Sequence, residues 1–118
     1  MQYMMLIYLD ENSMTPAEME DCYVESTQLT KELGASGNYL AAAPLHSTST
    51  ATSVQVRDGK SIVMDGPFAE TREQLGGYFM IEAKDLDEAI GIAARIPGVR
   101  RGTVEIRPVV DLSRLAQN

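Results

Sequence analysis

The sequence predicts an α+β domain of ferredoxin-like topology, a split βαβ arrangement into which a β-hairpin is inserted. Three observations support this fold class. Apolar runs typical of strands open and close the chain, two segments with strong helix-start signals lie between them, and an Asp-Gly pair near the middle joins two short runs. With 118 residues and 44% hydrophobic side chains, residues 1–118 are expected to form a single domain with its own core.

The first strand and the first helix carry the clearest signals. Residues 3–9 are a continuous apolar run, typical of a strand buried on both faces in the middle of a sheet. A helix is expected to begin at Pro16, because Thr15 can cap its first turn and Glu18 completes a capping box. The helix should extend to about Leu33, where glycines follow.

This helix is expected to turn an apolar stripe toward the sheet. By three-four spacing, the stripe contains Met19, Cys22, Ser26, Leu29 and Leu33. Cys22 is the only cysteine, so the chain can form neither an internal disulfide nor a cysteine-based zinc cage. On this stripe we expect Cys22 to be a small buried hydrophobic residue rather than a nucleophile.

The second half of the chain completes the split βαβ pattern. In chain order we expect an irregular edge strand over 38–45 interrupted at Pro44, a hairpin of 53–57 and 60–64 around Asp58-Gly59, a strand over 78–83, a helix from an Asp85 cap to Pro97-Gly98, and a final strand over 103–110. Two helices would cover one face of the sheet and leave the other open. Because an exposed apolar sheet face requires a partner, we expect a homodimer.

Composition narrows the classes of function. The net charge of −7 and the pI of about 4.6 argue against nucleic-acid binding, which usually needs a basic face. No leader and no membrane-length apolar run are present, so we expect a cytoplasmic protein without membrane contact. Gly76-Gly77 lacks the Lys-Ser/Thr of a phosphate loop, and no metal-ligand spacing links His46 with the acidic residues. We therefore expect no cofactor and no metal.

Residues 65–78 hold the densest mixture of charged, aromatic, glycine and proline residues in the chain. Asp65-Gly66-Pro67 predicts a turn, and Phe68 is expected to fill the core beneath it. A short helical turn or an exposed loop should follow, bearing Glu70, Arg72 and Glu73. Two interpretations stay open: a β-turn with its connection, or the wall of a polar pocket.

The stretch Asp-Gly-Pro-Phe-Ala-Glu-Thr-Arg-Glu-Gln-Leu-Gly-Gly-Tyr at 65–78 resembles the signature of the DGPF-type, YCII-related family. Residues 51–60, which end in Arg-Asp-Gly-Lys, and residues 85–89 fit the same pattern. The resemblance covers nearly the whole chain. It implies a small α+β domain of ferredoxin-like topology that pairs into a dimeric α/β barrel, and it implies no settled activity.

Three functions remain open. The first is a cofactor-independent enzyme that acts on a small acidic or carbonyl metabolite by proton transfer, with Asp65 and His46 as the acid and base. The substrate, an unknown small molecule, would be bound by Glu70, Arg72, Glu73, Arg57 and Tyr78. The same pocket suits a non-catalytic binding or sensing module, and the third function is a protein-interaction domain. A surface role is the alternative for His46.

Overall fold

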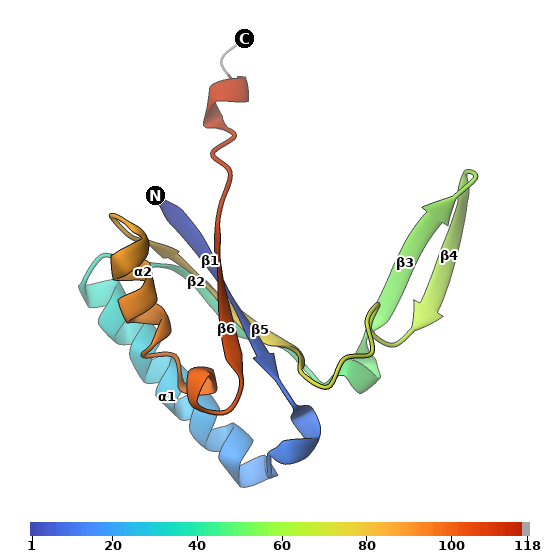
Figure 1. Ribbon diagram of the computed structural model, residues 1–118, viewed down its shortest axis with the longest axis horizontal. Helices are drawn as coiled ribbons and strands as arrows, with labels where there is room; N and C mark the ends of the chain where they lie inside the picture. Colours follow the sequence, from blue (N-terminus) through green and yellow to red (C-terminus); the bar gives the residue numbers. More distant parts are fainter. Residues whose placement is uncertain (117–118) are drawn as a thin grey trace.

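The α+β class is confirmed by the computed structural model, which describes residues 1–116. The helices and strands are β1 (Gln2–Leu9), α1 (Pro16–Ala35), β2 (Tyr39–Pro44), β3 (Thr52–Arg57), β4 (Lys60–Asp65), β5 (Gln74–Glu82), α2 (Leu86–Ala93) and β6 (Thr103–Pro108). Four strands form one antiparallel sheet in the order β2-β5-β1-β6, while β3 and β4 pair only with each other (Figure 1). With the β3–β4 hairpin set aside, this strand order is the expected ferredoxin-like one.

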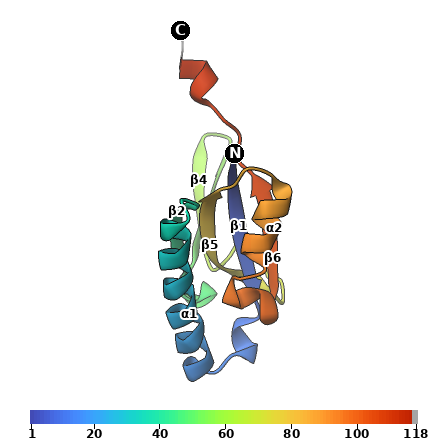
Figure 2. The ribbon, with the colours of Figure 1, turned by 90° about the vertical axis from the view of Figure 1, so that its left-hand side faces the viewer.

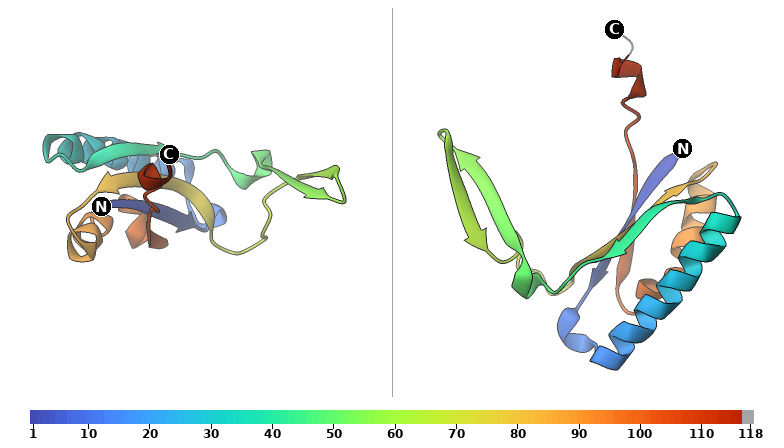
Figure 3. Two further views of the ribbon diagram at one scale, coloured as in Figure 1. Left: turned by 90° about the horizontal axis from the view of Figure 1, so that it is seen from above. Right: turned by 180° about the vertical axis from the view of Figure 1, so that it is seen from behind.

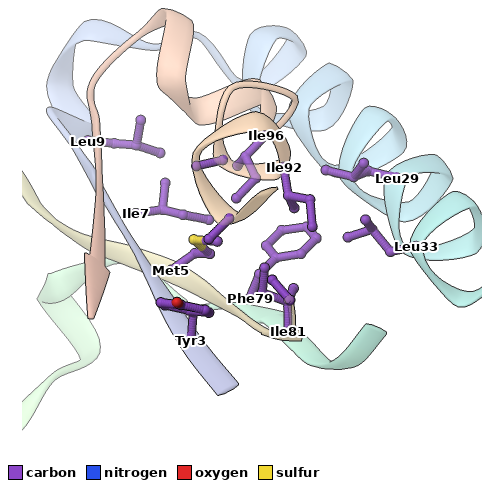
Figure 4. Packing of buried hydrophobic residues seen from close by; sticks show 13 residues of the cluster. Tyr3, Met5, Ile7, Leu9, Leu29, Leu33, Phe79, Ile81, Ile92 and Ile96 are labelled. Carbon is purple, nitrogen blue, oxygen red and sulfur yellow. The ribbon is translucent and has the colours of Figure 1, made fainter. Parts of the chain in front are cut away.

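Both helices lie against the same face of the sheet (Figure 2). The core between these layers is built from alternate residues of β1 and β5 together with α1 and α2. Figure 4 shows Phe79 and Ile81 of β5 pointing toward Leu29 and Leu33 of α1. Phe79 and Ile81 are 3% and 0% exposed, so this layer is sealed by residues of a single chain.

The second face of the sheet has no cover within the chain. On β1 the residues of the helix side are buried, but Met4, Leu6 and Tyr8 between them are only half-buried. The expectation that this strand is buried on both faces is therefore wrong for a single chain. Strand pairing places Met4 beside Met80 and Leu6 beside Tyr78, which makes the centre of this open face apolar.

Helix α1 begins as its sequence predicts. The Thr15 hydroxyl accepts a hydrogen bond from the Glu18 amide at 3.1 Å, and the Glu18 carboxylate accepts one from the Thr15 amide at 2.9 Å. These bonds to Thr15, together with the ion pair to Arg101, hold the pKa of Glu18 below its usual value. The helix ends at Ala35, slightly beyond the predicted Leu33.

Strands β3 and β4 form a hairpin that we call the arm, residues 52–65. Its turn is the predicted Asp58-Gly59, with φ of 52° and 74°, the left-handed geometry that two-residue hairpins use. The arm projects beyond the sheet, on the side away from both helices (Figures 1 and 3). The radius of gyration is 16.4 Å. A compact domain of this length would have about 13.5 Å.

The segment after the arm agrees with prediction in one respect and differs in others. Residues 69–73 form bends and irregular chain, mostly exposed, which is the exposed-loop alternative. Phe68 does not fill the core, because its side chain is 79% exposed. Strand β5 begins at Gln74, four residues before the predicted Tyr78. Gly76 and Gly77, which lie before the strand predicted over 78–83, are part of β5 and form a β-bulge. Ile7 pairs with Gly77 and Tyr8 with Leu75, so Gly76 is the extra residue.

The last elements are shorter than expected. Helix α2 starts after the predicted Asp85 cap, whose carboxylate accepts from the Glu88 amide at 2.9 Å. The helix ends at Ala93, and Pro97 opens a separate short 3₁₀ turn. Strand β6 ends at Pro108 rather than at residue 110.

Candidate functional site

A polar groove of about 560 Å³ lies where the chain leaves β1, β2 and β4. Its walls are Glu11, Asn12, Ser47, Thr48, Ser49, Asp65, Gly66, Pro67, Glu70, Thr71 and Gln74. Two of the predicted site residues, Asp65 and Glu70, are therefore brought to one place. Within residues 1–116, neither carboxylate has a hydrogen bond or ion pair to another side chain, so both are available to a ligand.

Glu11 organises this groove. Its carboxylate accepts hydrogen bonds from the Thr48 amide at 2.9 Å, the Thr48 hydroxyl at 3.0 Å and the Ser47 hydroxyl at 3.1 Å. These three bonds attach the loop after β2 to the end of β1. They also satisfy a carboxylate that sequence analysis did not select, since a Glu in a predicted turn carries no signal of a distant partner.

Arg72 and Glu73 lie beside the groove and contact the neighbouring strands. The Arg72 guanidinium pairs with Asp10 at 3.4 Å and is 91% exposed, so this ion pair is weak. The Glu73 carboxylate accepts a hydrogen bond from the Thr103 hydroxyl at 3.1 Å. Both side chains help to hold residues 65–78, which we call the central stretch, against the end of β1 and the start of β6.

Two predicted binding residues lie elsewhere in the chain. Arg57 is at the tip of the arm, opposite Lys60, which precedes Asp65 by five residues on β4. At the rise of a strand, this separation is roughly 17 Å. Tyr78 lies on the open face of the sheet, beside Leu6. A single chain therefore does not assemble all the predicted residues into one site.

His46 lies on an exposed loop after β2 and does not line the groove, although the next residue, Ser47, does. Its side chain has no hydrogen bond within residues 1–116. His46 is therefore an exposed residue next in sequence to a residue of the groove.

A second cavity, which we call the apolar pocket, lies between α1 and the sheet and has a volume of about 250 Å³. Its lining from α1 is Met19, Cys22, Tyr23, Ser26, Thr27 and Thr30. The sheet side contributes Ile7, Leu9 and Phe79, together with the two glycines of the β5 bulge. The volume suits a ring-sized molecule, below the range of drug-sized sites.

Cys22 corrects a prediction here. Its side chain is half-buried and lines the apolar pocket, so it is not part of the sealed core. The sequence patterns did not predict this pocket, although one residue of α1 pointed to it. Ser26, a hydroxyl in the middle of a predicted apolar stripe, faces the cavity rather than a close-packed neighbour.

The pocket and the groove are neighbours. Three segments of chain lead from one to the other: Leu9 to Glu11, Pro44 to Ser47, and Gly76 back to Gln74. Each of these segments spans two or three residues, at most about 10 Å of extended chain. His46 lies on the segment from Pro44 to Ser47. The apolar pocket and the acid-lined groove are therefore joined by short segments of chain, and His46 lies on one of them.

The lining of these cavities does not suggest a metal site. In the described part of the chain, no three His, Cys, Asp or Glu side chains are arranged to hold a metal ion. Among the same residues, no helix has both the length and the apolar character needed to cross a membrane.

Comparisons with known proteins agree with this description. The family model described as YCII-related domain matches residues 1–113. An uncharacterised protein of Rhizobium meliloti (strain 1021) is 36% identical, with 92% of each chain covered. A solved structure of 5-chloro-2-hydroxyhydroquinone dehydrochlorinase from Burkholderia phenoliruptrix AC1100, in complex with 2,5-dihydroxybenzoquinone, superposes with a TM-score of 0.51 at 12% identity. The match covers 93% of this chain and 94% of that one, and it shows a shared fold.

Proposed function

The chain belongs to the YCII-related family, and from that premise we propose that it is a homodimeric, cofactor-independent enzyme that transfers protons on a small carbonyl or enol compound. The ring or chain of the substrate lies in the apolar pocket, and its oxygen atoms face the polar groove. The observation that carries this proposal is that three short segments of the chain each contribute residues to both cavities.

The lining of each cavity supports this division of roles. Phe79, Ile7 and Leu9 offer apolar contacts, while the hydroxyls of α1 can orient an oxygen. Asp65 and His46 are the proposed base and acid, because Asp65 lines the groove, His46 precedes the groove residue Ser47, and neither exposed side chain is engaged by another side chain within residues 1–116. Proton transfer next to a carbonyl needs only such a pair, correctly placed.

The groove favours a carbonyl or enol over an acidic substrate. Its charged residues are all acidic: Glu11, Asp65 and Glu70. A carboxylate ligand would be repelled there unless Arg72 left Asp10 to meet it. The structural neighbour was solved with a dihydroxybenzoquinone, a planar compound with carbonyl and enol oxygens. This is the class of molecule that the proposal requires, and it gives a first compound to test.

The open face of the sheet supports the dimer. Met4, Leu6, Tyr78 and Met80 form its apolar centre. Two such faces packed together would form the dimeric barrel that the family resemblance implies, and would bury side chains that one chain leaves half-exposed.

The first test measures binding and turnover separately. 2,5-Dihydroxybenzoquinone, simple β-keto compounds and small carboxylic acids are screened by thermal shift, and bound compounds are followed by NMR for exchange of carbon-bound hydrogen in heavy water. Ser26→Leu fills the pocket and should abolish binding. Gln28→Leu adds the same side chain on an exposed position of α1 outside the pocket, and should bind normally.

Variants of the groove then separate the alternatives. Asp65→Asn and His46→Gln should retain binding and lose exchange by about 10²-fold or more if they act as base and acid. Binding without exchange in the unaltered protein would favour a sensing module. No binding to any compound of the panel would reject the small-molecule proposal and favour an interaction domain.

A further inference from the structure

The arm has apolar side chains on both faces and no covering element. Pairing places Val54 and Val63 opposite each other on one face, and alternation puts Ile62 and Met64 on the other. Val54 and Val63 are 62% and 64% exposed, and Ile62 and Met64 are each 41% exposed. A two-stranded hairpin alone is marginally stable in water, and apolar residues on both its faces add nothing unless something covers them.

The base of the arm is nevertheless fixed. The Gly66 amide donates to the Ala51 carbonyl at 2.7 Å, and the Ser53 hydroxyl donates to the Gly66 carbonyl at 2.8 Å. These bonds join the two ends of the hairpin where it leaves the rest of the chain. The arm is thus held closed at its base with its apolar faces exposed.

The direction of the arm identifies what can cover it. It stands on the side of the sheet opposite the helices, which is the side of the open face (Figures 1 and 3). A second copy that packed its sheet on that face would occupy the space that the arm borders. By two-fold symmetry, each arm would then reach the body of the other chain.

The distribution of charge in the chain also favours a second copy as the molecule that covers the arm. At the tip of the arm, residues 57–60 carry Arg57, Asp58 and Lys60, a net charge of +1. Asp65 at the base makes the arm as a whole neutral, whereas the whole chain has −7. The tip of the arm is therefore basic and the remainder of the protein is acidic. A second copy of the same chain presents the complementary charge to the tip.

We propose that the arm clasps a second copy of this chain, burying its valine face against the partner's body and bringing its basic tip close to the partner. The inference rests on the proposed homodimer and adds to it the element that holds the dimer together.

The test combines oligomeric state with contact mapping. Sedimentation velocity from about 1 to 100 μM is measured for the unaltered protein, Val54→Lys and Val24→Lys. Val24 is a matched control, because it is also 62% exposed but lies on α1, away from the arm. Val54→Lys should weaken dimerisation at least 10-fold, and Val24→Lys should leave it unchanged.

Contact mapping places the arm directly. A photo-crosslinking residue at position 56 is introduced into ¹⁵N-labelled chains, which are mixed with unlabelled chains and irradiated. Crosslinks that join labelled to unlabelled peptides are expected, and the same residue at position 24 should give none. A dimer without such crosslinks, and unaffected by Val54→Lys, would reject the arm while sparing the sheet-to-sheet dimer. A monomer at every concentration would reject both.

Discussion

The sheet and the arm are made of similar strands with opposite environments. On β5, Phe79 and Ile81 are almost completely buried beneath α1, whereas Val54 and Val63 of the arm are more than half exposed. The sequence patterns are alike, since β5 contains the apolar run Tyr78–Ile81 and β4 contains the apolar run Ile62–Met64. An apolar strand face therefore indicates that the face is buried, but it does not indicate whether the same chain or another chain buries it.

The largest expected difference between the two regions is in stability. Ile81→Ala leaves a cavity in the sealed core and should lower the free energy of unfolding by about 3 kcal/mol. Val63→Ala, in dilute monomeric protein, should change it by less than about 0.5 kcal/mol. Urea unfolding followed by tyrosine fluorescence is suitable, because the arm contains no tyrosine. Equal effects would mean that the arm is packed within its own chain.

Glycine substitutions extend the comparison of the sheet and the arm to the backbone. A Cβ on Gly102 would clash with the carbonyl oxygen of Tyr8, so Gly102→Ala should destabilise the sheet by about 2 kcal/mol. In the arm, Gly59 has open space around it but a φ of 74°, so Gly59→Ala should cost about 1 kcal/mol through strain alone. Gly91→Ala on α2, with free space and helical geometry, is the control and should be neutral or stabilising.

A smaller effect is expected at the start of α1, where the stability of the capping box depends on the ionisation of Glu18. Thr15→Ala should cost about 1 kcal/mol at neutral pH. Because the pKa of Glu18 is lowered in the folded state, its contribution is present above the usual pKa of 4.5 and disappears as the pH falls through the lowered value. Glu18→Gln should therefore be less stable than the unaltered protein at pH 7, and the difference should shrink toward pH 3.

The smallest effect is expected from the ion pair at the groove. Arg72→Ala removes the 3.4 Å contact with Asp10, but the guanidinium is 91% exposed, so stability should change by less than about 0.5 kcal/mol. Any larger loss, measured in the same urea experiment, would show that the central stretch depends on this contact. Arg72→Lys is the matched control, since it keeps the charge.

Local signals explain how much of the fold was predictable. The capping box of α1 and the Asp58-Gly59 turn act within a few residues, and both were correct. The strand predicted over 78–83 leaves out Gly76 and Gly77, because a sequence does not distinguish a bulge from the end of a strand. Phe68 was placed in the core because it is large and apolar, but the direction of a loop side chain depends on distant packing.

The candidate site was less predictable for a similar reason. The polar groove depends on contacts across more than thirty residues, such as those from Glu11 to Thr48, which no spacing rule detects. Asp65 and Glu70 were found because they lie in one dense motif. The apolar pocket was missed because its hydroxyl residues have the spacing of an ordinary helix face.

The bulge at Gly76 restricts how homologous chains can change in length. Leu75 pairs with Tyr8 and Gln74 with Leu9 only because one extra residue is accommodated on β5. The Gln74 side chain in turn donates to the carbonyls of Ala69 and Thr71 at 3.1 and 2.6 Å. Deletion of one glycine would reverse the faces of Gln74 and Leu75 and detach the central stretch. Related sequences should therefore tolerate substitutions between residues 69 and 73 more readily than insertions or deletions at 76.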